Sequence, residues 1–168
     1  DIYCIDNAGD WKILESVPFH EQVITYLPAT TDYTNFLITA VGVNYIAFVG
    51  SSSDTEIVID EQSDTDNLTF AYQMFKGLKK FNQDLSWWDG SNVTNWSEAF
   101  YDCEKFNGEV DNLVGSACTD ISHMFENAAK FNKPVDNWDT SNVTDISFMF
   151  HRCRYFNHSL NSWDVSNV

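Results

Sequence analysis

The 168-residue chain has few basic residues, with nine Lys and Arg against 25 Asp and Glu, which gives a formal net charge of -16. This imbalance argues against nucleic acids and anionic membranes as ligands, because contacts to phosphates need clustered basic side chains. Basic partners or divalent cations suit the charge better. Long apolar runs are also missing, since residues 36–49 are interrupted by Thr39, Gly42 and Asn44. A membrane-spanning helix needs about 20 apolar residues, so no span is predicted in this segment.

Signatures of catalytic and metal sites are missing as well. The chain has no nucleophile elbow, phosphate-binding loop, dinucleotide-binding glycine motif or metalloprotease His-Glu motif. Its four cysteines follow no Cys-x-x-Cys spacing and its four histidines are scattered, which argues against a zinc site. We therefore predict a protein that is not an enzyme, with no cofactor. The chain does have 43% apolar and 15% aromatic residues, enough for a packed protein rather than a disordered acidic tail.

The larger, C-terminal part of the sequence repeats with a period of 25 residues. The dipeptide Phe-Asn recurs at Phe81-Asn82, Phe106-Asn107, Phe131-Asn132 and Phe156-Asn157, without insertion or deletion. Other apolar columns keep the same step, among them one made of Phe75, Phe100, Phe125 and Phe150. A unit this short cannot bury its own apolar side, so successive copies have to stack on one another. We predict that residues 61–168 form a repeat solenoid of about four coils.

Each coil is predicted to combine a strand and a short helix. Residues 82–88 favour a strand that ends at the turn sequence Asp89-Gly90-Ser91-Asn92. Residues 144–153 have apolar residues at helical spacing. The expected fold class is therefore an α/β repeat solenoid of leucine-rich-repeat type, in which parallel strands stack about 4.8 Å apart and short helices complete each coil.

The repeat resembles a known family. The stretch Ala128 to Phe150 reads Ala-x-x-Phe-Asn-x-x-Val-x-x-Trp-Asp-x-Ser-Asn-Val-Thr-x-Ile-x-x-Met-Phe. This pattern is similar to the 25-residue repeat of BspA-type leucine-rich-repeat surface proteins, also found in mycoplasma-type surface lipoproteins. One copy departs from it, with Leu113-Val114 in place of Trp-Asp and Cys118 in place of Val. The resemblance implies an extracellular or cell-surface location and a role in adhesion or surface architecture, and it carries over no catalytic residue.

Residues 1–60 do not align to the repeat, because Gly50 stands where the period requires Phe. The ranges 22–27, 36–40, 43–49 and 56–60 are rich in Val, Ile, Thr, Tyr and Phe and are predicted to be strands. A solenoid exposes apolar side chains at its first coil, so we expect a small β-rich N-terminal cap there. An independent β domain is the alternative. The sequence begins without Met and stops inside a copy of the motif, so we expect a trimmed piece of a longer protein, truncated at its C-terminus.

Asparagine recurs in two columns of the repeat. The first column, with Asn82, Asn107, Asn132 and Asn157, is predicted to be a structural ladder whose buried amides satisfy backbone groups. The Ser-Asn-Val column has the same interpretation. Five Asn-x-Ser/Thr sequons offer candidate N-glycosylation sites, at Asn67, Asn92, Asn95, Asn142 and Asn157. Three sequons follow from the repeat itself and a buried ladder asparagine cannot carry a sugar, so glycosylation stays open.

Aspartates also form columns, with Asp89, Asp139 and Asp164 in one and Asn95, Asp120 and Asp145 in another. Like charges in neighbouring coils repel one another by about 1 kcal/mol in water. Either each carboxylate accepts backbone N–H groups in an Asx turn, or Ca²⁺ binds between coils. No Asp-x-Asp-x-Asp-Gly loop is present, which favours the turns.

Cysteine and tryptophan follow the apolar columns, with one exception. Cys103 and Cys153 share a column with Leu78 and Ala128, so they are predicted to be buried core residues two coils apart, too far for a disulfide. A bridge between Cys103 and Cys118 stays open. Trp87 occupies a column that otherwise holds Asn and Ser. It is therefore predicted to face solvent, as a possible ligand contact.

Together these features predict a non-catalytic extracellular or cell-surface repeat protein that acts as a protein-binding or adhesion module. The alternative is a structural subunit that self-assembles into an extracellular filament, coat or appendage. A glycan-acting enzyme with its site outside the repeats is a further alternative. Expected partners are proteins, further copies of the chain or glycans, but not nucleic acid.

Overall fold

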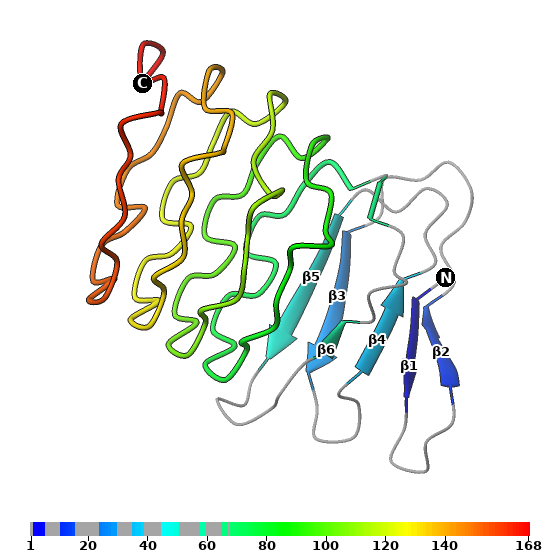
Figure 1. Ribbon diagram of the computed structural model, residues 1–168. Helices are drawn as coiled ribbons and strands as arrows, with labels where there is room; N and C mark the ends of the chain where they lie inside the picture. Colours follow the sequence, from blue (N-terminus) through cyan, green and yellow to red (C-terminus); the bar gives the residue numbers. More distant parts are fainter. Residues whose placement is uncertain are drawn as a thin grey trace.

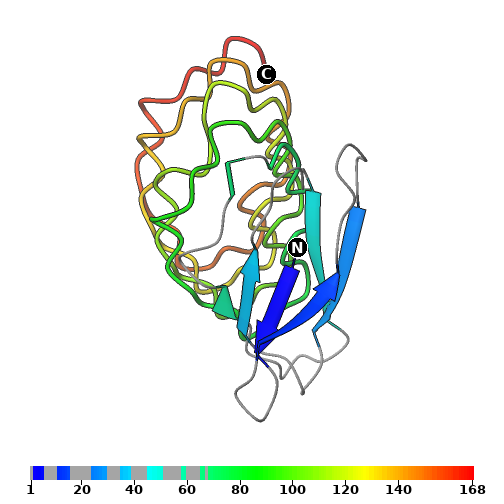
Figure 2. The ribbon, with the colours of Figure 1, turned by 90° about the vertical axis from the view of Figure 1, so that its right-hand side faces the viewer.

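The computed structural model describes residues 65, 66 and 68–168 in full, and within residues 1–64 the backbone of six strands and the side chains of residues 47, 48, 58 and 59 (Figure 1). In Figure 1 the repeat region forms a row of similar coils that runs from the strands to the C-terminus. Seen along this row, in Figure 2, the coils overlap in one closed outline. Each successive copy of the repeat therefore lies beside the previous one.

The N-terminal strands form two sheets. Strand β1 pairs with β2 and with β4 in antiparallel fashion, while β4–β6 and β3–β5 are parallel pairs, so the sheets have the orders β2-β1-β4-β6 and β3-β5. The strand bounds are Ile2–Ile5 for β1, Trp11–Glu15 for β2, Ile24–Ala29 for β3, Asn35–Ile38 for β4, Tyr45–Gly50 for β5 and Val58–Ile59 for β6. Each of the four predicted ranges overlaps one of β3 to β6, whereas β1 and β2 were not predicted.

The strand and the helix predicted within each coil were wrong. Residues 68–168 contain turns and single parallel bridges, but no strand and no helix. In the segment predicted to be helical, hydrogen bonds span three residues, as from Met149 N to Ile146 O (3.2 Å) and from His151 N to Phe148 O (2.9 Å). Phe148 and Arg152 have φ angles of 56° and 63°, which a right-handed helix cannot contain. The same two positions have positive φ in every coil: Gln73, Glu98 and His123 match Phe148, and Gly77, Asp102 and Asn127 match Arg152.

Backbone hydrogen bonds between coils explain why the helix does not form. Alternate N–H groups of one coil donate to alternate carbonyls of the next, as from Phe100 N to Met124 O (2.9 Å) and from Phe125 N to Met149 O (3.0 Å). In residues 71–77, 96–102 and 121–127 every such donor lies in the earlier coil, whereas Thr119 N and Thr144 N, just before stretches of this kind, donate back to the earlier coil. The N–H groups that a helix would use internally are therefore used to join neighbouring coils.

Two columns of phenylalanine form the centre of the core. In the column that starts at Phe75, the rings of successive coils stack with centroids 5.1, 5.2 and 6.0 Å apart. In the column of the Phe-Asn dipeptides, which starts at Phe81, the centroids are 5.5, 5.9 and 5.9 Å apart. Within a coil the two rings also stack, with Phe125 and Phe131 only 3.8 Å apart. Phe75, Phe81, Phe100, Phe106, Phe125 and Phe131 are fully buried, while Phe150 and Phe156 in the last coil are partly buried. The predicted columns are thus stacked side chains in the structure.

Strand β5 continues the phenylalanine column at the N-terminal side. Phe48 is buried, stacks on Phe75 with ring centroids 5.5 Å apart, and donates its N–H to Met74 O at 2.7 Å. Phe100 and Phe125 make the same type of bond to the residue before the next phenylalanine. Phe48 therefore takes the place that the strict period assigns to Gly50. Ile59 of β6 belongs to the same core and exchanges two hydrogen bonds with the Gln83 side chain, at 2.7 and 2.5 Å.

Candidate functional site

The Phe-Asn asparagines form a hydrogen-bonded ladder along the stack. In the first three, Oδ1 accepts the backbone N–H of the asparagine in the next coil, at 2.7 Å from Asn107 to Asn82, 2.8 Å from Asn132 to Asn107 and 2.9 Å from Asn157 to Asn132. We call this row the asparagine ladder. All four side chains are exposed, so the expectation that they are buried was wrong. The ladder joins the surfaces of the coils rather than their interior.

Most of the sequon asparagines that the structure describes use their amide nitrogen, the atom that N-glycosylation modifies, to hold a neighbouring coil. Asn92 Nδ2 donates to Asp66 O (3.0 Å), Asn95 Nδ2 to Asp120 Oδ2 (3.1 Å) and Asn142 Nδ2 to Ser116 O (2.9 Å). Asn67 lies outside the described residues. Asn157 is exposed, and within the described residues its amide nitrogen donates no hydrogen bond, so it is the most accessible of the sequons that the structure describes.

Both aspartate columns form Asx turns. In the first, Asp89, Asp139 and Asp164 accept the N–H of the serine two residues on, at 2.9, 3.1 and 2.9 Å. In the second, Asn95, Asp120 and Asp145 do the same at 2.8, 2.9 and 2.8 Å. The serine donors hold the pKa values of Asp89, Asp139, Asp145 and Asp164 below the ordinary value. These carboxylates are therefore ionised at neutral pH and stabilise local turns.

The three described cysteines are free thiols, so the bridge from Cys103 to Cys118 that the sequence left open is not formed. Cys103 is fully buried and donates to Phe75 O at 3.0 Å, and Cys153 donates to Phe125 O at 2.8 Å. Burial raises the pKa of all three thiols, to about 11 for Cys118 and about 12 for Cys153. They are therefore protonated and weakly nucleophilic at neutral pH.

Trp87 lies in a groove rather than on open surface. Its ring is half-buried, packs against Trp88 with centroids 5.4 Å apart, and donates from Nε1 to Asp84 O at 3.1 Å. The prediction that it faces solvent was therefore only partly right. Next to it is a groove of about 500 Å³ that crosses three coils and whose lining includes the aspartates Asp89, Asp111 and Asp139. We call this the Trp87 groove.

The positive charges gather on a different part of each coil. Segments 76–80, 101–105, 126–130 and 151–155 stack on one another and contain seven of the nine Lys and Arg residues but only three acidic ones. We call these four segments the basic edge. Their formal charge of +4 contrasts with -16 for the whole chain.

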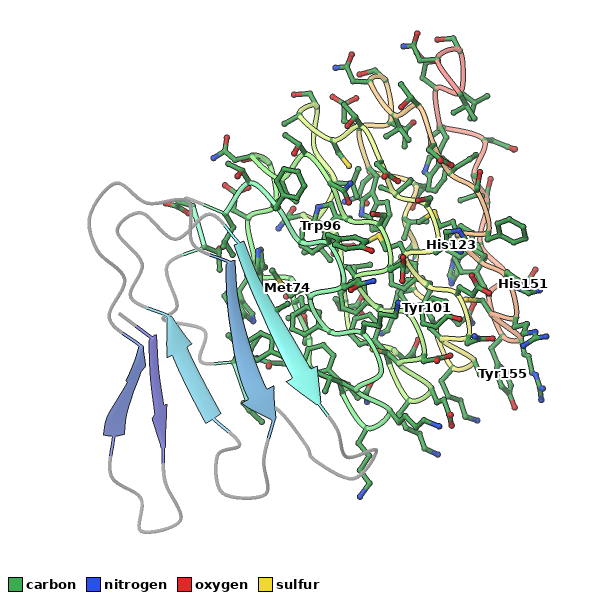
Figure 3. The ribbon with its side chains drawn as sticks, turned by 180° about the vertical axis from the view of Figure 1, so that it is seen from behind. Met74, Trp96, Tyr101, His123, His151 and Tyr155 are labelled. Carbon is green, nitrogen blue, oxygen red and sulfur yellow. The ribbon has the colours of Figure 1, made fainter. Side chains whose placement is uncertain are left out.

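At the start of two segments of the basic edge, Glu126 and His151 take part in a cluster in which two histidines share one carboxylate. His123 Nδ1 lies 2.5 Å from Glu126 Oε2, and His151 Nδ1 of the next coil lies 2.9 Å from Glu126 Oε1 (Figure 3). Burial alone raises the pKa of Glu126, but the hydrogen bonds to the two histidines outweigh it, so the pKa lies below its ordinary value. Within the described residues, no group of three or more His, Cys, Asp or Glu side chains has the geometry to hold a metal ion. Nor does any helix in this part of the chain have the length and apolarity to cross a membrane.

Comparison with known proteins gives one family match. No curated protein and no solved structure is significantly similar to the chain. The profile of a family described as "Mycoplasma protein of unknown function, DUF285" matches residues 48–123 and 69–168. The match begins at Phe48, the residue that starts the phenylalanine column. It spans the whole repeat region and well over half of the sequence, and the chain therefore belongs to the DUF285 family.

Proposed function

We propose that this chain is a non-catalytic repeat protein of the extracellular space or cell surface that binds protein partners and so serves as an adhesion module. In this proposal residues 61–168 are a solenoid related to the BspA-type leucine-rich repeats, and the N-terminal strands are its cap. Stacking of equivalent side chains at a 25-residue step supports the solenoid. The bond from Phe48 N to Met74 O supports a cap rather than a separate domain.

The Trp87 groove is the observation that carries the binding proposal. An aromatic ring in the lining of the groove, together with ionised Asp89 and Asp139, provides both components of a site for a basic side chain. The guanidinium or ammonium group would face the indole ring and the carboxylates at once. Lys and Arg side chains exposed on a partner protein are ligands of this kind, which agrees with the acidic charge of the chain.

The repeat itself supplies a matched variant for the test. Asn112 and Asn137 occupy the column of Trp87, and their amides donate to Ser86 O and Asp111 O at 2.9 Å each. Trp87→Asn therefore introduces the residue that this column already accommodates and leaves the net charge unchanged.

Beads coated with the protein are allowed to adhere to cultured animal cells, and binding of the soluble protein to poly-L-arginine is measured in parallel. We expect the Trp87→Asn variant to lose roughly 1 kcal/mol of binding to the peptide, about fivefold in Kd, together with most bead adhesion. Ser116→Ala, in the same groove, is the control and keeps both. Unchanged binding by Trp87→Asn would refute the groove as the site.

A structural subunit of a filament or coat is the second candidate, and the separation of charge favours it. The basic edge of one copy complements the acidic Trp87 groove of another. An interface between two different surfaces of the same protein adds copies into an open filament, unless the rotation between copies closes a ring. Sedimentation at increasing concentration and at low ionic strength tests this role. A monomer under all these conditions would exclude self-assembly through these surfaces.

A further inference from the structure

The last residue of each basic-edge segment belongs to one row along the stack, and in three of the four segments it is lysine. Lys80, Lys105 and Lys130 occupy one column of the repeat, all three are exposed, and Tyr155 follows them in the last coil. The Lys130 ammonium lies over the Tyr155 ring, 4.5 Å from its centroid (Figure 3). The row therefore presents one cation in each of three coils and ends at an exposed aromatic ring.

The core fixes the spacing of this row. Each member directly precedes a phenylalanine of the column whose rings lie 5.5, 5.9 and 5.9 Å apart. The residue after each phenylalanine belongs to the asparagine ladder, whose hydrogen bonds hold the same coils together. The backbone on both sides of the row is therefore held by its neighbours, and the residues that carry the cations repeat once in each coil.

A row of amide donors accompanies the lysines. Lys105 lies at the end of a turn that Phe106 N closes by donating to Cys103 O, and Lys105 and Asn107 are both exposed on either side of the buried Phe106. The ladder uses the oxygens of these amides, while Nδ2 of Asn107, Asn132 and Asn157 makes no hydrogen bond within the described residues. Cations for acidic groups and amides for hydroxyl groups thus run side by side.

A groove of about 480 Å³ lies along the same edge, and Asn127, Arg152 and Arg154 are among its lining residues. Asp102 and Glu104 line it as well. Glu104 is ion-paired with Lys79 at 2.8 Å, so part of this negative charge is neutralised. The cationic surface is narrow, because outside the basic edge the chain has a formal charge of -20. A broad polyanion such as duplex nucleic acid would be repelled by these flanks.

From this arrangement we infer that the basic edge binds a linear anionic polysaccharide, with a carboxylate or sulfate on its sugars facing the lysine row and the arginines. Single-stranded nucleic acid fits less well, because its bases stack on several exposed aromatic rings in succession. The exposed ring beside these cations is that of Tyr155 alone among the members of the row. The inference deepens the proposed adhesive function by adding a second ligand class, at residues that the Trp87 groove does not include.

The test measures binding of the purified chain to alginate, which carries carboxylates, and to heparin, which also carries sulfates, with neutral dextran as the blank. Lys105→Gln and Lys133→Gln are a matched pair, since each removes one charge but Lys133 pairs with Glu109 away from the row. We expect Lys105→Gln to weaken binding roughly threefold and Lys105→Gln/Lys130→Gln roughly tenfold, while Lys133→Gln binds as the parent does. Melting temperatures of all variants confirm that they are folded.

Several outcomes would overturn the inference. They are equal losses for Lys105→Gln and Lys133→Gln, binding to neither polysaccharide at physiological salt, and tighter binding to poly(U) than to either polysaccharide. Formation of dimers through the lysine row, blocked by Lys105→Gln/Lys130→Gln, would also overturn it in favour of a second copy of the chain. None of these results bears on Trp87, so the cell-adhesion experiment stays an independent test of the proposed function.

Discussion

Replacement of Asn132 by Leu tests the asparagine ladder. Asn132 Oδ1 accepts the N–H of Asn157 at 2.9 Å, and leucine has no acceptor. A hydrogen bond of this type contributes about 0.5–1.5 kcal/mol net, and the exposed N–H recovers part of that from water. We expect the variant to lose about 1 kcal/mol of unfolding free energy, or roughly 2–4 °C in melting temperature for a chain of this size.

A second substitution at the same position separates the acceptor from the rest of the side chain. Asn132→Asp keeps an oxygen at the Oδ1 position, so it should retain the bond to Asn157 N and melt above Asn132→Leu at pH 7. Both variants are followed by circular dichroism during heating and by urea titration. Equal melting temperatures for Asn132→Leu and the parent chain would refute the ladder as a stabilising feature. Equal losses for the two substitutions would show that the acceptor is not what matters.

Three further predictions concern the core, the turns and the thiols. Phe125→Ala removes a fully buried ring and should cost about 3–5 kcal/mol in urea unfolding, whereas Phe156→Ala in the last coil should cost clearly less because that ring is only partly buried. The pKa of Asp139 is held below the ordinary value of 3.8 by the Ser141 hydroxyl and amide. Its stabilisation is therefore present above about pH 4 and is lost as pH falls through the lowered pKa, so Asp139→Asn, which keeps the acceptor, should flatten the acid side of the stability profile. Cys103 should not react with iodoacetamide at pH 7 until the chain unfolds, and rapid labelling of the native protein would contradict its burial.

The sequence was sufficient to predict which side chains meet, but not the backbone that brings them together. A strict 25-residue step places Phe100 and Phe125 in one column whatever the local conformation is, and the structure stacks them. The helix was predicted from apolar spacing alone. Spacing of three and four residues also arises in a chain of successive turns, and the positive φ angles of Phe148 and Arg152 leave no signal in the residue types.

Two other features were beyond the reach of the periodic pattern. Phe48 lies 27 residues before Phe75 instead of 25, so a fixed step misses it even though its ring joins the same column. The asparagine ladder was expected in the interior, with buried amides that satisfy backbone groups. The hydrogen bond instead runs along the surface, from Asn107 N to Asn82 Oδ1 in the neighbouring coil. Whether the ladder is buried or lies along the surface depends on the direction in which the backbone N–H groups point.

That direction also explains how one fold can carry varied surfaces. Because backbone groups and the phenylalanine and asparagine columns join the coils, other exposed columns can vary without breaking the stack, even where single pairs such as Lys79 and Glu104 also join two coils. The column of Lys79 shows this freedom, since it continues with Glu104, Ala129 and Arg154. The neighbouring column keeps lysine in three successive coils, and of these Lys130 contacts the Tyr155 ring of the next coil. Backbone and core contacts already hold these coils together, so the lysine row is the place where we propose that a ligand binds, rather than the ladders beside it.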